Sequence, residues 1–431
     1  MLSFEQAPPI SVTFRFFLTA PCFGVAAGLL FAESGPAALA SRWTPSALAL
    51  THLLTVGFML HAMCGALLQF VPVATGANVW RPLWLANLVH PALLAGASIL
   101  VYAMANSRPE LLAAAELLLG VGLVAFCAIC GVALFLTPAR GISLAALRAA
   151  LVGLAVTSVL GLLLAQALSS RRAMALPALA DLHAAWGLGG WALTLLAGVS
   201  FTVVPMFQMT PPYPRWMPRW LPTTIGVALV GAAVAALAVH GAWSWNLAIA
   251  MAVLMSTAFA GVTLLLQRRR RRARTDASFA LSRGAMISLL AAGAGWLASI
   301  GYPGLSDSPW LPVGIGIVCL VGVFVSAING MLYKIVPFVI CLKLPAGVGS
   351  LHAPPNIRMF ISERAMDGQM RLHFAALAML LASLAMPQLA RPAGLTFAAS
   401  CGWLGLNLLG ALRVYRSFKD RSPAVAAARG S

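Results

Sequence analysis

The histidines are the side chains of this sequence best suited to chemistry, because the chain around them is strongly apolar. A neutral imidazole offers a nitrogen lone pair to a metal ion, and burying it among apolar helices is costly unless it binds something. A buried imidazole that only hydrogen-bonds a neighbouring helix is the common alternative. The role of each histidine therefore depends on its depth. The seven positions are His52, His61, His90, His183, His240, His352 and His373.

Sulfur-bearing side chains surround one of these histidines and recur further along the chain. Met59 and Met63 flank His61, and Cys64 follows directly. Thioether, thiol and imidazole groups together are the ligands that a soft Cu(I) ion prefers. Methionine and cysteine are also ordinary packing residues of apolar helices, so each group alone is a weak signal. The candidate metal ligands are His52, Met59, His61, Met63, His90, His183, Met206 and Met209.

Long apolar runs must position these side chains. Hydrophobic residues make up 61% of the chain and charged residues 9%, and the mean hydropathy is +0.91. Because a helix needs about 20 apolar residues to cross a bilayer, the runs predict an all-α bundle of about twelve transmembrane helices in a single domain, residues 1–431. The predicted spans are residues 14–33, 47–73, 83–104, 111–137, 144–168, 181–208, 220–239, 245–266, 283–302, 311–338, 372–388 and 394–415.

The positive charges orient this bundle. Of the 28 Lys and Arg residues, five lie in the loops that follow odd-numbered spans, and the other 23 lie in the remaining loops and the termini. Since Lys and Arg gather on the cytoplasmic side, we expect a bacterial inner-membrane protein with both termini in the cytoplasm. The five exceptions are Arg42, Arg108, Arg171, Arg172 and Arg391. The predicted cytoplasmic segments are the basic loop 267–283, the loop 339–371 and the tail 417–431.

The net charge of +18 narrows the choice of partners. In a soluble domain such a charge would suggest nucleic acid, but no soluble domain is predicted here. Basic loops that face anionic lipid account for the charge. We therefore expect the lipid bilayer as a partner and no nucleic acid.

Depth sorts the histidines into three groups. The outer group shares one level and could form one site, whereas a solvated or capping role is expected for the inner group. Lys334, near the inner end of the tenth span, is expected either to extend its ammonium to lipid headgroups or to face the bundle and hold an anion. The outer group is His52, His183 and His240, the middle group is His61 and His90, and the inner group is His352 and His373.

The architecture and the segment Thr51–Gly57 resemble subunit I of the heme-copper oxidases. The resemblance extends to divergent relatives of that family, namely the NnrS proteins linked to nitric-oxide tolerance and oxidase-like proteins linked to copper supply. It implies a bundle of twelve helices, with one histidine early in the second helix and another opening the sixth. The segments that look similar to the divergent relatives are Arg15–Leu18, Val204–Pro212 and Asn329–Pro337.

The resemblance also implies more heme and copper ligands than this chain contains. The family uses a helix-2 histidine for a low-spin heme, histidines on helices 6 and 7 for copper, and two histidines on helix 10. His52 and His183 stand at matching positions, and His240 could replace part of the helix-7 pair. Residues 311–338 contain no histidine. A complete binuclear centre is therefore not expected, and no residue is assigned a catalytic role.

Three functions follow from these expectations. The preferred one is non-catalytic copper binding or transport for the assembly of a respiratory oxidase or another cuproenzyme, with assembly factors as partners. The ion would enter at His52 and His183, pass the middle ligands, and leave at Met206 and Met209. The alternative is NnrS-like heme binding in a nitric-oxide response, with His52 and either His90 or His183 as axial ligands. An active terminal oxidase or nitric-oxide reductase is disfavoured by the missing ligands.

Overall fold

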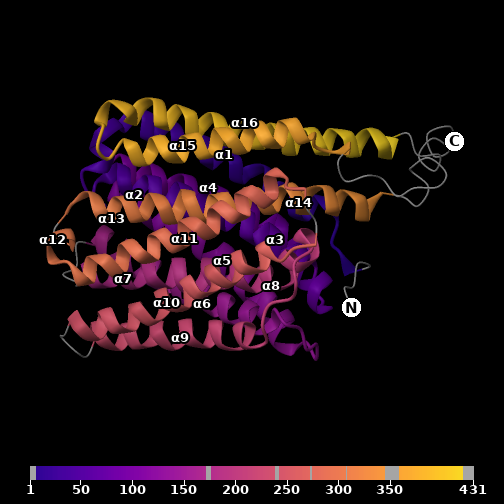
Figure 1. The fold of residues 1–431 in the computed structure, drawn as a ribbon, viewed down its shortest axis with the longest axis horizontal. Helices are drawn as coiled ribbons and strands as arrows, with labels where there is room; N and C mark the ends of the chain where they lie inside the picture. The colour runs from indigo at the N-terminus through magenta and orange to yellow at the C-terminus, as the bar shows by residue number, and fades with distance from the viewer. Residues whose placement is uncertain are drawn as a thin grey trace.

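The structure is a computed structural model that describes residues 6–170, 176–237, 242–271, 274–306, 308–344 and 359–420. Its long helices pack side by side in one bundle (Figure 1). In the described part of the chain, eleven helices are long and apolar enough to cross a membrane. The predicted all-helical, multi-pass architecture is therefore confirmed.

Nine of the long helices in the described part of the chain are continuous. They are α1 (Ile10–Ser34), α4 (Pro82–Ala105), α5 (Leu112–Leu136), α6 (Leu144–Ser170), α9 (Trp216–Leu237), α10 (Ala242–Arg268), α11 (Ala277–Gly301), α15 (Glu363–Ala382) and α16 (Ala390–Asp420).

Three further spans, the second, sixth and tenth, are each interrupted by a π-helical segment of eight residues. Runs of π-helix this long are rare, and π-segments are frequent at functional sites. The three spans are α2 (Pro45–His52), η3 (Leu53–Leu60) and α3 (His61–Thr75); α7 (Leu176–Ala185), η5 (Trp186–Leu193) and α8 (Thr194–Gln208); and α13 (Trp310–Ile317), η6 (Val318–Val325) and α14 (Ser326–Lys343).

The eleventh helix differs from the predicted span 372–388, because α15 covers Glu363–Ala382. Its start is set by Ser362, whose side chain accepts a hydrogen bond from the amide of Ala365. This cap begins the helix among charged residues, which a search for apolar runs does not include. The shift moves His373 from the foot of the helix to its middle.

Each π-segment ends in the same way. The first residue of the following α-helix turns its side chain back to the backbone carbonyl five residues earlier, a carbonyl that the wider turn leaves accessible. The three contacts are His61 Nδ1 with Val56 O at 3.1 Å, Thr194 Oγ1 with Gly189 O at 2.8 Å, and Ser326 Oγ with Val321 O at 3.2 Å.

The three interrupted spans also share a sequence pattern without gaps. A glycine, seven residues, a second glycine, five residues and then Val-Pro occur in each span. The positions are Gly57, Gly65, Val71 and Pro72; Gly190, Gly198, Val204 and Pro205; and Gly322, Gly330, Val336 and Pro337.

The second glycine of each pattern lets the span approach the helix that precedes it. A Cβ atom on Gly198 would lie 2.8 Å from the Cβ of Ala146 in α6. Likewise, Gly65 lies against Phe16 in α1, and Gly330 against the backbone of Ser278 in α11. In three places, therefore, an interrupted span packs against the helix before it through a glycine at the same position of the pattern.

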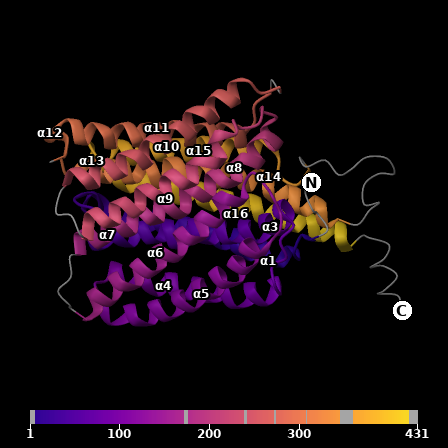
Figure 2. The ribbon, with the colours of Figure 1, turned by 90° about the horizontal axis from the view of Figure 1, so that it is seen from below.

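The described helices form three units of four long helices each, in which α15 is the one long helix that is not among the eleven membrane-crossing candidates. We call them unit 1 (α1 to α5), unit 2 (α6 to α10) and unit 3 (α11 to α16). In each unit the last two helices pack against each other, and the last helix contacts the first helix of the next unit. Thus α5 lies along α6 (Figure 2) and α10 along α11. The ring closes because α16 lies along α1 (Figure 1).

Candidate metal centre

His52 and His183 form the first histidine pair, where units 1 and 2 meet. Each lies just before a π-segment, His52 as the last residue of α2 and His183 near the end of α7. Their ring centroids are 6.4 Å apart, and the ring planes differ by 18°. Two residues before His183, Asp181 forms a 2.6 Å ion pair with Arg42, which links the same two units. The proximity expected from the shared depth of these histidines is present.

Backbone carbonyls determine which nitrogen of each ring is free. His52 Nδ1 lies 2.8 Å from Leu48 O, and His183 Nδ1 lies 3.0 Å from Thr157 O. Because a carbonyl only accepts hydrogen bonds, each Nδ1 carries the hydrogen and each neutral ring keeps its lone pair on Nε2. Histidines that ligate metals are held in this manner, with the other nitrogen bonded to a backbone carbonyl.

Gly161 of α6 completes the support of His183. The imidazole lies directly against this glycine, and a Cβ atom at position 161 would come within 2.9 Å of His183 Cε1. His183 was predicted from the sequence, but Gly161 and Thr157 were not. Their role depends on packing between α6 and α7, which spacing along the chain does not show.

His61 and His90 form the second histidine pair, inside unit 1. Their ring centroids are 5.9 Å apart and the ring planes are perpendicular. His61 is fully buried, and its Nε2 atom has no hydrogen-bond partner among the described residues. Since Nδ1 of His61 faces the carbonyl of Val56, the lone pair is on the unpartnered Nε2.

His90 is oriented by a short chain of hydrogen bonds. Thr19 Oγ1 donates to Arg15 O at 2.8 Å, and His90 Nε2 lies 2.9 Å from the same hydroxyl oxygen. The hydroxyl hydrogen is already used, so His90 Nε2 donates and the lone pair of the neutral ring is on Nδ1. The second pair therefore also offers two lone-pair nitrogens.

Aromatic rings enclose the second pair. Phe23 packs on His61 with ring centroids 5.2 Å apart, and Phe16 lies 5.1 Å from His90 and 6.2 Å from His61. Both phenylalanines are buried in the core. Within this pair His61 is fully buried, whereas His90, like His52 and His183, is partly exposed.

The four predicted methionine ligands fall into two groups. Met59 and Met63 are buried on the same span as His61. Met206 and Met209 are 38% and 51% exposed, so they do not lie in the enclosed surroundings of the second pair. Among the described residues, no cluster of three or more His, Cys, Asp or Glu side chains is arranged to hold a metal ion. The candidate imidazole ligands among the described residues therefore form two separate pairs.

The expectation for one inner histidine is wrong. His373 is fully buried rather than solvated, and its Nε2 lies 2.7 Å from Ser326 Oγ. The early start of α15 explains this burial. His240 and His352 lie outside the described residues.

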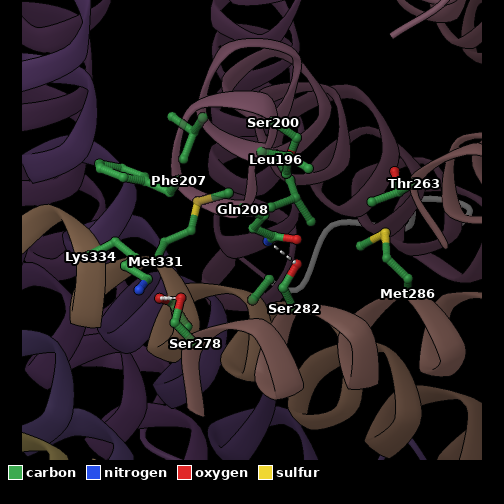
Figure 3. A pocket seen from close by; sticks show the side chains of 14 residues that line it. Leu196, Ser200, Phe207, Gln208, Thr263, Ser278, Ser282, Met286, Met331 and Lys334 are labelled. Carbon is green, nitrogen blue, oxygen red and sulfur yellow. Dashed lines mark hydrogen bonds between the residues drawn. The ribbon is translucent and has the colours of Figure 1, made fainter. Parts of the chain in front are cut away.

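Lys334 faces a partner inside the bundle rather than extending freely to headgroups. Its Nζ lies 2.6 Å from Oδ2 of Asp276, and both side chains are 22% exposed. The other oxygen of Asp276 caps α11 by accepting from the amide of Phe279. The pair lies beside a cavity of about 20 Å³ between units 2 and 3, which Lys334 lines together with residues such as Ser200 and Ser282 (Figure 3).

A polar network at this cavity was not identified from the sequence. Gln208 Nε2 donates to Ser282 Oγ at 3.0 Å, as Figure 3 shows, and Gln267 Nε2 donates to Gln208 Oε1 at 3.0 Å. Nearby, Tyr213 hydrogen-bonds Thr263, and burial raises the pKa of the Tyr213 phenol. The sequence signal that could have revealed this network is the set of polar residues near the ends of the apolar runs.

Comparison of the sequence with protein-family models and with curated proteins finds no match to either. The fold and composition define a multi-pass α-helical membrane protein.

Proposed function

We propose that this protein binds Cu(I) between His52 and His183 and supplies copper for the assembly of a respiratory oxidase or another cuproenzyme. The observation that most directly supports this proposal is the distance of 6.4 Å between the centroids of the two rings. A metal–imidazole bond is about 2.0 Å long and the centroid lies roughly 1 Å behind the nitrogen, so one ion held in line between two rings separates their centroids by about 6 Å.

The number and type of ligands favour Cu(I). Structural zinc sites use four ligands, whereas the described residues offer two imidazole nitrogens at this position. Both nitrogens carry lone pairs because backbone carbonyls hold the opposite side of each ring. The second pair, His61 and His90, would receive the ion next, with Met59 and Met63 as nearby soft ligands. An exit at Met206 and Met209 remains a prediction.

Titration of the purified protein with Cu(I) against a competing chelator tests this proposal. We expect His52→Ala, His183→Ala and the double variant to lose the same amount of tightly bound copper, because removing either ligand opens the site. His373→Gln, which changes a histidine outside both pairs, should bind as the wild type does. Equal binding by the wild type and the double variant would remove this site from consideration.

A growth experiment tests the physiological part. A deletion strain should lose respiratory-oxidase activity in copper-poor medium and recover it when copper is added. Each histidine pair offers two ligands, and the two pairs lie at separate places. They therefore do not form one binuclear centre, so the purified protein should not reduce oxygen or nitric oxide. Measured turnover of either gas would contradict a copper-supply role.

NnrS-like heme binding is the second candidate function, supported by the same ring geometry. Two nearly parallel imidazoles with free Nε2 atoms also match the axial ligands of a heme iron. Of the two partners considered for His52, His183 is the better one, because His90 pairs with His61. Soret absorption that disappears in both His52→Ala and His183→Ala, with no copper bound, would favour this function over copper supply.

A further inference from the structure

A groove of about 470 Å³ opens beside the start of α4, well away from the first histidine pair. It lies at the end of the bundle where α1 and α4 begin and α16 ends, the right-hand end in Figure 1. We call this the arginine-rich end, because the run Arg268 to Arg271 follows α10 there. The groove is lined by Pro9, Arg81, Pro82, Leu83, Trp84 and Asn87.

The polar atoms that this groove offers are hydrogen-bond donors. Arg15 donates from its guanidinium to Asn87 Oδ1 at 2.7 Å, so the amide oxygen of Asn87 faces Arg15 and its NH₂ group remains to donate. Arg81 adds a guanidinium, which has only donors. None of the ion pairs among the described residues involves Arg15 or Arg81. The lining holds one cation, Arg81, and a second cation, Arg15, bonds the lining residue Asn87. No carboxylate of the described residues lines the groove, so the groove favours an oxyanion.

The remaining lining is apolar and aromatic. Trp84 and Leu83 are exposed, and Trp80, which is outside the lining, is also exposed, with its ring centroid 6.0 Å from that of Trp84. Tryptophan at the end of a membrane-spanning helix marks the headgroup region of the bilayer. An oxyanion site bordered by exposed apolar side chains at this depth fits a phosphate that carries acyl chains better than a free phosphate ion.

Unit 2 repeats part of this arrangement at the equivalent helix. Trp216 and Trp220 begin α9, are exposed, and are four residues apart, as Trp80 and Trp84 are. Arg219 lies over the ring of Trp220 at 5.3 Å, as Arg81 lies over Trp80 at 5.0 Å. The pairing of arginine and tryptophan thus recurs at the arginine-rich end, where the third helix of a unit begins.

We infer that the groove at the start of α4 binds the headgroup of an anionic phospholipid. Arg81 and Asn87 donate to the phosphate oxygens, while Leu83 and Trp84 contact the glycerol and the upper acyl chain. This site is separate from the histidine pairs, so it stands or falls independently of copper or heme binding.

Native mass spectrometry of the full-length protein tests the site. The protein is equilibrated with equal amounts of phosphatidylglycerol and phosphatidylcholine, and the lipids it retains are counted. We expect phosphatidylglycerol to be retained preferentially, and Arg81→Gln to lower that retention about fivefold, the effect of one arginine near an anionic lipid. Asn87→Asp is a sharper variant, because it keeps the acceptor for Arg15 but replaces the donor with a negative charge.

Arg42→Gln is the matched control, since Arg42 also lies over a tryptophan, Trp43, but at the opposite end of the bundle and paired with Asp181. It should leave phosphatidylglycerol retention unchanged. Unchanged retention in both Arg81→Gln and Asn87→Asp, or an equal loss in Arg42→Gln, would overturn the inference. Competition by millimolar inorganic phosphate as strong as that by phosphatidylglycerol would instead assign the groove to free phosphate and also overturn it.

Discussion

The hydrogen bonds of the individual imidazoles are the main support for the proposed metal site. His52 and His183 are held by backbone carbonyls, which side-chain substitution cannot remove directly. The support that can be changed is Gly161, against which the ring of His183 lies. Substituting this glycine therefore tests whether the orientation of the His183 ring matters for metal binding.

Gly161→Ala should weaken Cu(I) binding about 10- to 100-fold, the usual cost of disturbing a residue that orients a metal ligand. The added Cβ would lie 2.9 Å from His183 Cε1, so the ring must move. Chelator competition measures the change. Gly120→Ala is the control, because a Cβ there would meet only Leu162, at 4.0 Å. Equal affinities in the two variants would mean that the position in which Gly161 holds the His183 ring does not matter for binding.

The ion pair of Lys334 and Asp276 makes a prediction about stability. Lys334→Met should lower the free energy of unfolding by about 1–3 kcal/mol, because it removes the ammonium that lies 2.6 Å from the largely buried carboxylate of Asp276. Adding Asp276→Asn should restore part of the loss, since asparagine keeps the cap of α11 without the charge. Thermal unfolding in detergent measures both variants. A double variant less stable than Lys334→Met would contradict this account.

Depth along apolar runs was sufficient to predict that His52 and His183 share a level, but not the pairing of His61 with His90. The second pair depends on how Thr19 and Val56 orient the rings, and neither residue has a distinctive sequence signal. The partner of Lys334 was missed for a related reason. Asp276 lies 58 positions away along the chain and meets Lys334 only because α11 packs on α14.

Among the helices, the interrupted spans are the features that hydropathy did not predict. An apolar run looks the same whether its backbone is α-helical or π-helical, so the spans were found and their interruptions were not. The recurring pattern of two glycines and Val-Pro was present in the sequence and would have revealed three related spans. The position of α15 was missed because a serine cap, rather than an apolar residue, begins that helix.

Thr194→Val tests whether the hydrogen bond that ends η5 holds the π-segment in place. The variant removes the bond from Thr194 Oγ1 to Gly189 O with little change of shape. Amide hydrogen exchange within Trp186–Leu193 should become roughly fivefold faster, as expected for a bond of about 1 kcal/mol. The control is Thr223→Val in α9, whose hydroxyl bonds a carbonyl of an ordinary α-helix. No difference between the variants would assign the π-segment to packing alone.

For the molecule as a whole, composition was sufficient to predict the number of spans closely and the helical class fully. The three units and the closure of α16 on α1 were not predicted, because they rest on contacts between helices that are far apart along the chain. The orientation in the membrane remains a prediction from charge.

Reporter fusions test that orientation. Fusions after Arg271 and after Lys419 should report a cytoplasmic position, and fusions after Arg108 and after Ser308 a periplasmic one, because Lys and Arg are retained on the cytoplasmic side. The arginine-rich end and the groove at α4 would then face the cytoplasmic leaflet. A periplasmic signal after Arg271 would invert the bundle and place the first histidine pair on the cytoplasmic side.

The contact between α16 and α1 has a consequence for how the chain is connected. Because each unit meets the next in the same way around a closed ring, the order in which the units are linked is not fixed by their packing. A circular permutant that joins the ends of the chain and opens between α5 and α6 would keep the contacts between all three units. A ring of three like units is also the arrangement of a homotrimer. The single chain thus has the geometry that three copies of one four-helix ancestor would form after gene duplication and fusion.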